Sequence, residues 1–300
     1  MPWLETRHID SDVSEAFAMF LHDLDRKLAD INTDRAVLCC RLLAEFLYGS
    51  SYEALLEKMP WVALSLNPNN VLLEAEHYAP LEQQAWARVK PLLWLWYNFD
   101  QSPAAHNMAF GIEFRRVLAK YVFKRCGQNV RIFPGVQFSV GYNLSVGDDV
   151  AIHRNVFIDD IGGVTLHNKV SISDYANIYS HTHSPLESSD VTLKHTTIGA
   201  GVRITYHATV LAGSTISDDA IVGTMSIVTK DIEPHQIAYG IPARPMREKV
   251  RQPMPIVVDS RVFVRPPDRQ GNADYPKEGT NHQTKAVQSA PSAYPNTRLD

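Results

Sequence analysis

Two histidines stand two positions apart in the stretch NIYSHTHSPLESSD, residues 177–190, and their side chains are able to do chemistry. An imidazole titrates near neutral pH, so His181 or His183 is suited to act as a general base or as a metal ligand. A hydrophilic surface loop would contain the same residue types. The choice between a catalytic base, a metal site and a plain loop depends on the structure that the flanking sequence builds.

A six-residue repeat surrounds the histidines. Aliphatic residues recur at Val146, Ile152, Ile158, Leu166, Ile172 and Ile178, and again at Ile198, Ile204, Val210, Ile216, Val222 and Val228. Small or β-branched residues stand four positions later, at Val150, Val156, Gly162, Val170, Ala176, Thr182, Val202, Ala208, Ser214, Ala220 and Ser226. This period matches neither a helix nor an alternating strand. It predicts a solenoid of short strands that turns a corner every six residues and stacks coil upon coil at about 4.8 Å.

The repeat is interrupted once, at the histidines. Twenty residues separate Ile178 from Ile198, so about fourteen of them are expected to leave the coil as a loop. Thr182 falls on a small corner position, which predicts that the neighbouring His181 and His183 point outward from the packed interior. Loops that leave a rigid scaffold are frequent sites of function.

Residues 128–248 resemble the hexapeptide-repeat acyltransferases, especially the sugar O-acetyltransferases. The resemblance is strongest in the closing stretch IVGTMSIVTKDIEPHQIAYGIPARPMREK. It implies a left-handed parallel β-helix, a homotrimer with active sites between neighbouring subunits, and acetyl-CoA or another acyl-CoA as co-substrate, with no metal. The implied reaction is acyl transfer, with acetyl as the expected group, to a hydroxyl or amine of a small acceptor.

The resemblance also assigns roles to polar residues on the acceptor side. His183 falls on the family's catalytic histidine, which implies that it is the general base, whereas His181 does not match and is a candidate for acceptor binding. Asp159 and Asp160 match the place where the family binds acceptor hydroxyls, although stabilising a turn is an equally good interpretation of either carboxylate. Asn155 is a weaker candidate for acceptor binding.

On the coenzyme A side, the resemblance places Thr229 and Lys230 at a corner that contacts the cofactor. Arg244 matches a residue that binds the nucleotide phosphates, as suits a cation facing several phosphate charges. Tyr206 and Thr224 fall where the backbone lines the pantetheine channel. Both have larger side chains than is common in the sugar acetyltransferases, so the acceptor and the donor size stay open.

Two rival interpretations remain. The γ-class carbonic anhydrases share the fold and hold zinc with three histidines, and a zinc site needs three converging ligands plus an open position. This chain lacks their paired-histidine motif. The second rival is a non-catalytic β-helix that acts as a scaffold or binds a ligand.

The rest of the chain divides into three predicted parts: an α-helical region over residues 1–126, a β-helix acyltransferase domain over 127–250 and a largely disordered tail over 251–300. Helical spacing predicts that helices end at Gly49 and Gly127. We expect the helical region to cover the open end of the β-helix, whose unpaired strand edges would otherwise favour aggregation. The tail is rich in Pro, Gly, Asn and Ser and poor in large apolar residues.

Composition sets the remaining limits. Of 300 residues, 45% are hydrophobic and 21% are charged, as in ordinary globular proteins, and the formal net charge of −4 gives no electrostatic reason to expect nucleic-acid binding. The start of the chain does not resemble a signal peptide, and its most apolar run is too short to span a bilayer. The expected location is therefore the cytoplasm.

Overall fold

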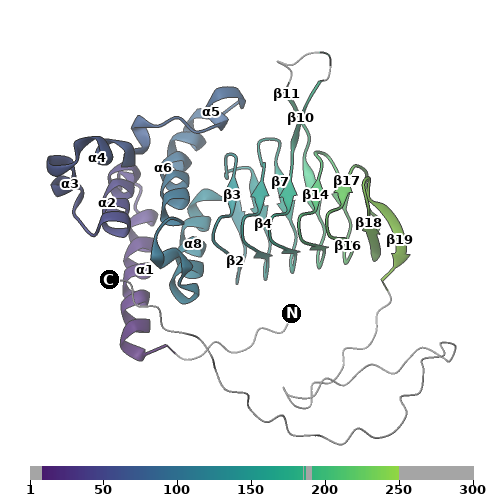
Figure 1. Ribbon diagram of the computed structural model, residues 1–300, viewed down its shortest axis with the longest axis horizontal. Coiled ribbons are helices and arrows are strands. Elements are labelled where there is room, and N and C mark those ends of the chain that lie inside the picture. Colours follow the sequence, from purple (N-terminus) through teal and green to yellow (C-terminus); the bar gives the residue numbers. More distant parts are fainter. Residues whose placement is uncertain (1–8, 185, 187–190, 250–300) are drawn as a thin grey trace, which may run out of the picture. The chain divides into compact units, whose positions relative to one another are not determined.

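A helical segment is followed by a stack of short parallel strands in the computed structural model, which describes residues 9–184, 186 and 191–249 (Figure 1). The α-helices are α1 (Ser11–Ala29), α2 (Arg35–Tyr48), α3 (Tyr52–Lys58), α4 (Pro60–Leu66), α5 (Ala75–Tyr78), α6 (Gln83–Phe99), α7 (Pro103–His106) and α8 (Met108–Val122). Their apolar faces, rich in Phe, Leu and Trp, form a core that is continuous with the interior of the strands. None of the helices in this described part is both long and apolar enough to cross a membrane.

The strands form a parallel β-helix with three faces. Face A contains β1 (Arg125–Cys126), β4 (Leu144–Val146), β7 (Val164–Leu166), β12 (Thr196–Ile198) and β15 (Thr215–Ile216). Face B contains β2 (Arg131–Ile132), β5 (Ala151–Ile152), β8 (Ser171–Ile172), β13 (Arg203–Ile204), β16 (Ile221–Val222) and β18 (Gln236–Tyr239), which pairs with the antiparallel β19 (Arg244–Glu248). Face C contains β3 (Gln137–Phe138), β6 (Phe157–Ile158), β9 (Asn177–Ile178), β14 (Thr209–Val210) and β17 (Ile227–Val228). The chain turns from A to B to C in each coil, so the predicted coil of three short strands is confirmed.

The interior is filled by the predicted columns. Each of the twelve repeating aliphatic residues is at most 1% exposed. Residues of one column stack in register between coils, as Ile152 does on Ile172 and Ile158 on Ile178. Because every interior side chain lies against those of the coils on either side, the corner positions are held to within the tolerance of a close-packed core.

One corner prediction was wrong. Thr182 is exposed, and the corner position is taken by the fully buried Ser180, whose hydroxyl accepts a hydrogen bond from the Gly162 N–H at 2.8 Å. The chain leaves the coil directly after Ser180. It forms an antiparallel hairpin of β10 (His181–His183) and β11 (Val191–Leu193), in which Thr182 pairs with Thr192.

The helix boundaries agree with the sequence at one glycine and differ at the other. Gly49 ends α2 in the left-handed conformation with φ of 59°, as expected. The last helix ends at Val122, before Gly127, and β1 already pairs with β4. Gly127 is required for a different reason, since a Cβ there would lie 2.4 Å from the backbone carbon of Gly147 in the next coil.

The helical segment covers the first coil by satisfying its backbone. The carbonyls of Val150, Val156 and Ile158 in the second coil accept N–H groups of the first coil, as Val150 O does from Arg131 N at 2.9 Å. The equivalent carbonyls of the first coil have no preceding coil to accept from. Side chains of α6 and α8 donate to three of them: Trp96 Nε1 to Val136 O, the Tyr97 hydroxyl to Phe138 O, and Arg116 Nε to Val130 O.

A buried ion pair adds a fourth link. The fully buried Arg115 of α8 pairs with Asp100, and the second carboxylate oxygen of Asp100 accepts the Gly135 N–H of the first coil at 2.7 Å. These contacts agree with the expected covering role of the helices. The three-part division of the chain stays a prediction, and the proposed tail, 251–300, lies outside the described residues.

Replacing Tyr97 by Phe tests this arrangement. The change removes one hydroxyl and leaves the Phe138 carbonyl without its donor, so we expect the free energy of unfolding to fall by about 1–3 kcal/mol. Urea unfolding measures it. The matched control is Tyr48→Phe, at an exposed tyrosine of α2, where the change should stay within about 0.5 kcal/mol. Equal stability of the two variants would contradict a capping role for Tyr97.

Candidate active site

The candidate site is built on the corner between faces C and A, here called the C–A corner. In the first two coils this corner is longer than the others, because eight positions instead of six separate Phe138 from Val146 and Ile158 from Leu166. In the third coil the β10–β11 hairpin leaves from the same corner. The additional residues lie outside the packed columns, so they are available for polar contacts between coils.

Asp160 holds this corner together. Its fully buried carboxylate accepts hydrogen bonds from the backbone N–H groups of Val140, Gly141 and Asn143, at 2.9, 3.0 and 3.2 Å. Burial, only partly offset by these donors, raises the pKa of Asp160 to about 6. Of the two interpretations of this residue, the structure supports the turn-stabilising one. An acceptor has no access to a carboxylate enclosed in this way.

Asp159 points in another direction, toward the histidines. One carboxylate oxygen accepts from the Ser139 hydroxyl at 2.9 Å. The other lies 2.6 Å from Nδ1 of His181 and also accepts the backbone N–H groups of Ser180 and His181. The Asp159 side chain is 1% exposed and that of His181 is 13% exposed. Since a carboxylate accepts, Nδ1 of His181 is the donor in this contact.

His183 lies at the end of β10 and is exposed. Its ring meets the ring of His181 edge to face, with centroids 5.1 Å apart and planes at 90°. The corner therefore holds a row of three side chains, from the buried Asp159 through His181 to the exposed His183. A carboxylate that orients an imidazole next to an accessible imidazole is an arrangement suited to proton transfer at the surface of a rigid scaffold.

Two of the predicted coenzyme A residues lie at a different corner of the protomer. Tyr206 and Thr224 are exposed at the corner between faces B and C, here called the B–C corner, in two successive coils. The Thr224 hydroxyl lies 3.3 Å from that of Thr205, and the Tyr206 ring packs edge-on against Tyr175. Both predicted side chains point outward and leave the column of interior residues undisturbed.

Thr229 and Lys230 follow β17 at the C–A corner, and both are exposed. Arg244 begins β19 and is also exposed, with Nη1 donating to the Ala243 carbonyl at 3.0 Å. Asn155 occupies the B–C corner with φ of 56°, a conformation that asparagine tolerates. Within one protomer it is separated from Asp159 and His181 by face C, so the structure does not bring this predicted acceptor residue to the histidines.

Two residues at the site were missed from the sequence. Ser139 stands twenty positions before Asp159, the length of one coil, so its place beside that carboxylate could have been found from the spacing. Tyr78, at the end of α5, packs against His181 with ring centroids 5.7 Å apart. No pattern in the sequence predicts this contact, because Tyr78 lies in the helical segment.

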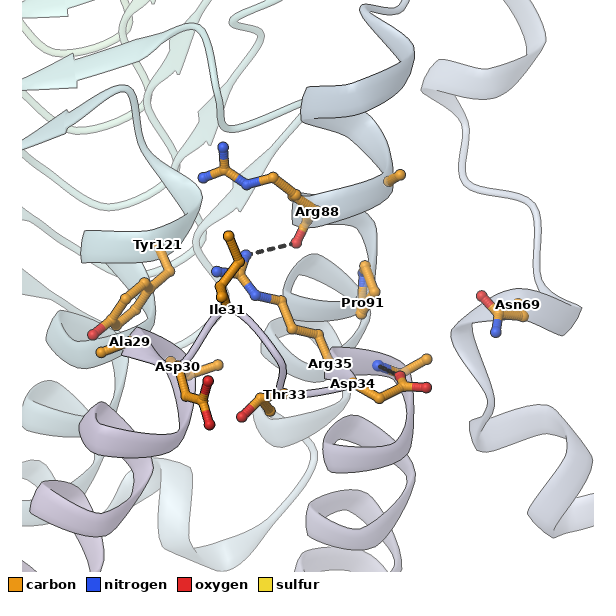
Figure 2. A pocket seen from close by; sticks show the side chains of 13 residues that line it. Ala29, Asp30, Ile31, Thr33, Asp34, Arg35, Asn69, Arg88, Pro91 and Tyr121 are labelled. Carbon is orange, nitrogen blue, oxygen red and sulfur yellow. Dashed lines mark hydrogen bonds between the residues drawn. The ribbon is translucent and has the colours of Figure 1, made fainter.

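Other parts of the protomer offer less to acyl transfer. A cavity of about 650 Å³ lies between the α1–α2 connection and α6, where Arg35 Nη1 donates to the Arg88 carbonyl (Figure 2). It is lined by none of the residues predicted for the reaction. In the part of the chain that the structure describes, no three or more His, Cys, Asp or Glu side chains converge as a zinc site requires.

The pKa of Asp160 predicts how stability depends on pH. A carboxyl whose pKa is about 6 when folded and about 3.9 when unfolded stabilises the protein below pH ~4, and this contribution is lost as the pH rises through ~6. Asp160→Asn removes the titration. We expect the free energy of unfolding of the wild type, relative to the variant, to fall by about 2 kcal/mol between pH ~4 and ~7. Thermal or urea unfolding across that range measures it, and a difference that is constant with pH would contradict the assignment.

This architecture is similar to that of known acetyltransferases. No family model matches the chain. The galactoside O-acetyltransferase of Escherichia coli K12 is 33% identical over 158 residues, an alignment that covers 51% of this chain and 75% of that enzyme. Among solved structures, a galactoside acetyltransferase in complex with coenzyme A is 29% identical, with a TM-score of 0.50, over 57% of this chain and 84% of the other.

A maltose O-acetyltransferase from Clostridium difficile 630 shares the fold, with a TM-score of 0.51 and 24% identity over 61% of this chain and all of that one. The fold is thus a left-handed parallel β-helix preceded by helices. Taken with the six-residue columns and the extruded histidine hairpin, the sequence identity shows that the chain belongs to the hexapeptide-repeat acyltransferase family and resembles its sugar O-acetyltransferases.

Proposed function

We propose that this enzyme transfers an acetyl group from acetyl-CoA to a hydroxyl of a small acceptor, with His183 as the general base. As a member of its family the chain is a CoA-dependent acetyltransferase, and coenzyme A is the acyl carrier in the galactoside acetyltransferase complex. The observation that carries the assignment of the base is the exposed His183 ring beside the partly buried His181, which pairs with the buried Asp159. The acceptor itself and the cytoplasmic location are part of the proposal.

The chemistry requires little more than a positioned base. The His183 imidazole takes the proton of the acceptor hydroxyl as its oxygen attacks the thioester carbonyl. The tetrahedral intermediate then collapses, the carbon–sulfur bond breaks, and the departing thiolate takes the proton back from the imidazolium. A thioester is already activated, so no covalent enzyme intermediate is needed.

Asp159 and His181 act in this proposal as positioning residues. The Asp159 carboxylate fixes the ring of His181 through Nδ1, and the edge-to-face contact of His181 limits the orientations open to His183. Five hydrogen bonds hold Asp159 itself, the fifth from the backbone N–H of Ile161 at 3.5 Å. The orientation of His183 is therefore restricted although the residue lies in an exposed hairpin. Such preorganisation lowers the free-energy cost of reaching the reactive geometry.

The active enzyme is proposed to be a homotrimer with shared sites. The histidines lie at the C–A corner, whereas Tyr206 and Thr224 lie at the B–C corner of the same protomer, with face C between them. If coenzyme A is bound along the B–C corner, a single protomer does not bring its thioester to its own His183. A neighbouring copy that sets its B–C corner against this C–A corner completes the site. Thr229 and Lys230, at the C–A corner that faces the neighbour's B–C corner, and Arg244 would bind the nucleotide end, where the two cations suit the phosphates.

His183→Ala tests the general base. We expect trimer assembly and binding of coenzyme A to persist while acetyl transfer falls at least about a hundredfold, because proton removal in the transition state is lost. Thiol release from acetyl-CoA is followed with a panel of sugars, polyols and amines. The control is His22→Ala, at an exposed histidine of α1, which should retain wild-type turnover. Equal activity of the His183 variant and the wild type refutes the assignment.

A mixing experiment tests the shared site. His183→Ala and Thr224→Trp are each expected to be inactive alone, the first without its base and the second with a blocked cofactor channel. In trimers co-expressed from both, about a quarter of the interfaces pair an intact His183 with an intact Thr224, so activity should return to about a quarter of the wild-type value. A site contained in one protomer would regain nothing on mixing.

A further inference from the structure

The short helix α5 brings the helical segment to the histidines. Tyr78, its last residue, is 36% exposed and lies with its ring centroid 5.7 Å from that of His181. Between α5 and face C is a cavity of about 150 Å³, whose lining includes Glu74, Tyr78, Tyr97, Gln137, Ser139 and Phe157. Ser139 joins this cavity directly to the site, since its hydroxyl donates to Asp159.

The lining has both polar and aromatic character. Among the described residues, no hydrogen bond or ion pair engages the exposed carboxylate of Glu74, so it is available to a ligand. Burial, with contributions from Glu74, Asp159 and Tyr179, raises the pKa of Tyr78 to about 12, so its phenol stays protonated through the neutral range. Carboxylate and phenol groups are able to accept and donate hydrogen bonds to neutral hydroxyls, while aromatic rings pack on apolar ring faces.

We propose that Glu74 and Tyr78 select the acceptor: the cavity between α5 and face C receives it, Glu74 binds its hydroxyls, and Tyr78 limits its size beside His181. The inference rests on the proposed function and assigns to the helical segment a role in specificity beyond covering the first coil.

Size and charge then define the acceptor. At about 150 Å³ the cavity is small, which suits a small acceptor. Glu74 and Asp159 place two negative charges near it. Like-charge repulsion in a partly desolvated site disfavours acceptors that carry a carboxylate or a phosphate. The expected acceptor is a neutral polyol or a single sugar ring.

Kinetics of three variants test this. The probes are methyl glycosides, their uronic acid counterparts and disaccharides. We expect Glu74→Gln to raise the KM for the neutral methyl glycosides about tenfold. The same variant should reduce the preference of the enzyme for methyl glycosides over uronic acids by at least about tenfold. Tyr78→Ala should increase the ratio of disaccharide to monosaccharide turnover about tenfold. Tyr78→Phe keeps the ring and should keep the size limit. For all three, the KM for acetyl-CoA is expected to stay within about twofold, as it would not if the variants disturbed the fold.

Matched control variants separate a change in acceptor preference from a general effect of substitution on the enzyme. Glu57→Gln and Tyr48→Ala alter exposed residues of α3 and α2, and should leave acceptor preference unchanged. If the wild type transfers acetyl groups and His183→Ala does not, while Glu74→Gln and Tyr78→Ala both keep the wild-type preference for charge and size, the inference fails and the proposed function stands. If the wild type acetylates no hydroxyl acceptor at all, both are overturned.

Discussion

A closed triangular interior constrains the rest of this protein. Each coil contributes the same few side chains to the inside, and any residue that does not fit must leave at a corner. The columns tolerate no insertion along a face, because the register of every following coil would change. Additional chain is therefore concentrated at the C–A corner, where two coils have longer turns and the third carries the hairpin with both histidines.

Buried carboxylates turn that irregular corner into a rigid one. Asp160 and Asp159 are adjacent in sequence and equally buried, yet one binds three backbone N–H groups of the preceding turn and the other binds Ser139 and His181. Burying a carboxylate is costly unless donors surround it, so each is held in place by the hydrogen bonds that it satisfies. Asp160 fixes the turn, and Asp159 fixes the orientation of the His181 imidazole, which contacts His183.

A stacked fold also has an open end, and the helical segment covers it. Donors from Trp96, Tyr97 and Arg116 take the place of the N–H groups that a preceding coil would supply. The same segment extends to α5 and places Tyr78 against His181. The helical segment that covers the end of the β-helix thus also reaches the candidate site.

The sequence by itself determined the coil, its interior columns and the position of the extruded segment, because these depend on local spacing that repeats every six residues. It also indicated His183, through resemblance and through its place in that segment. Only the tertiary structure decided between Asp159 and Asp160, moved the corner from Thr182 to Ser180, and revealed Ser139 and Tyr78. Contacts between coils join residues about twenty positions apart, and the contact with α5 joins residues more than a hundred apart. Side-chain direction at such distances follows from packing and hydrogen-bond satisfaction in three dimensions, which no local period encodes.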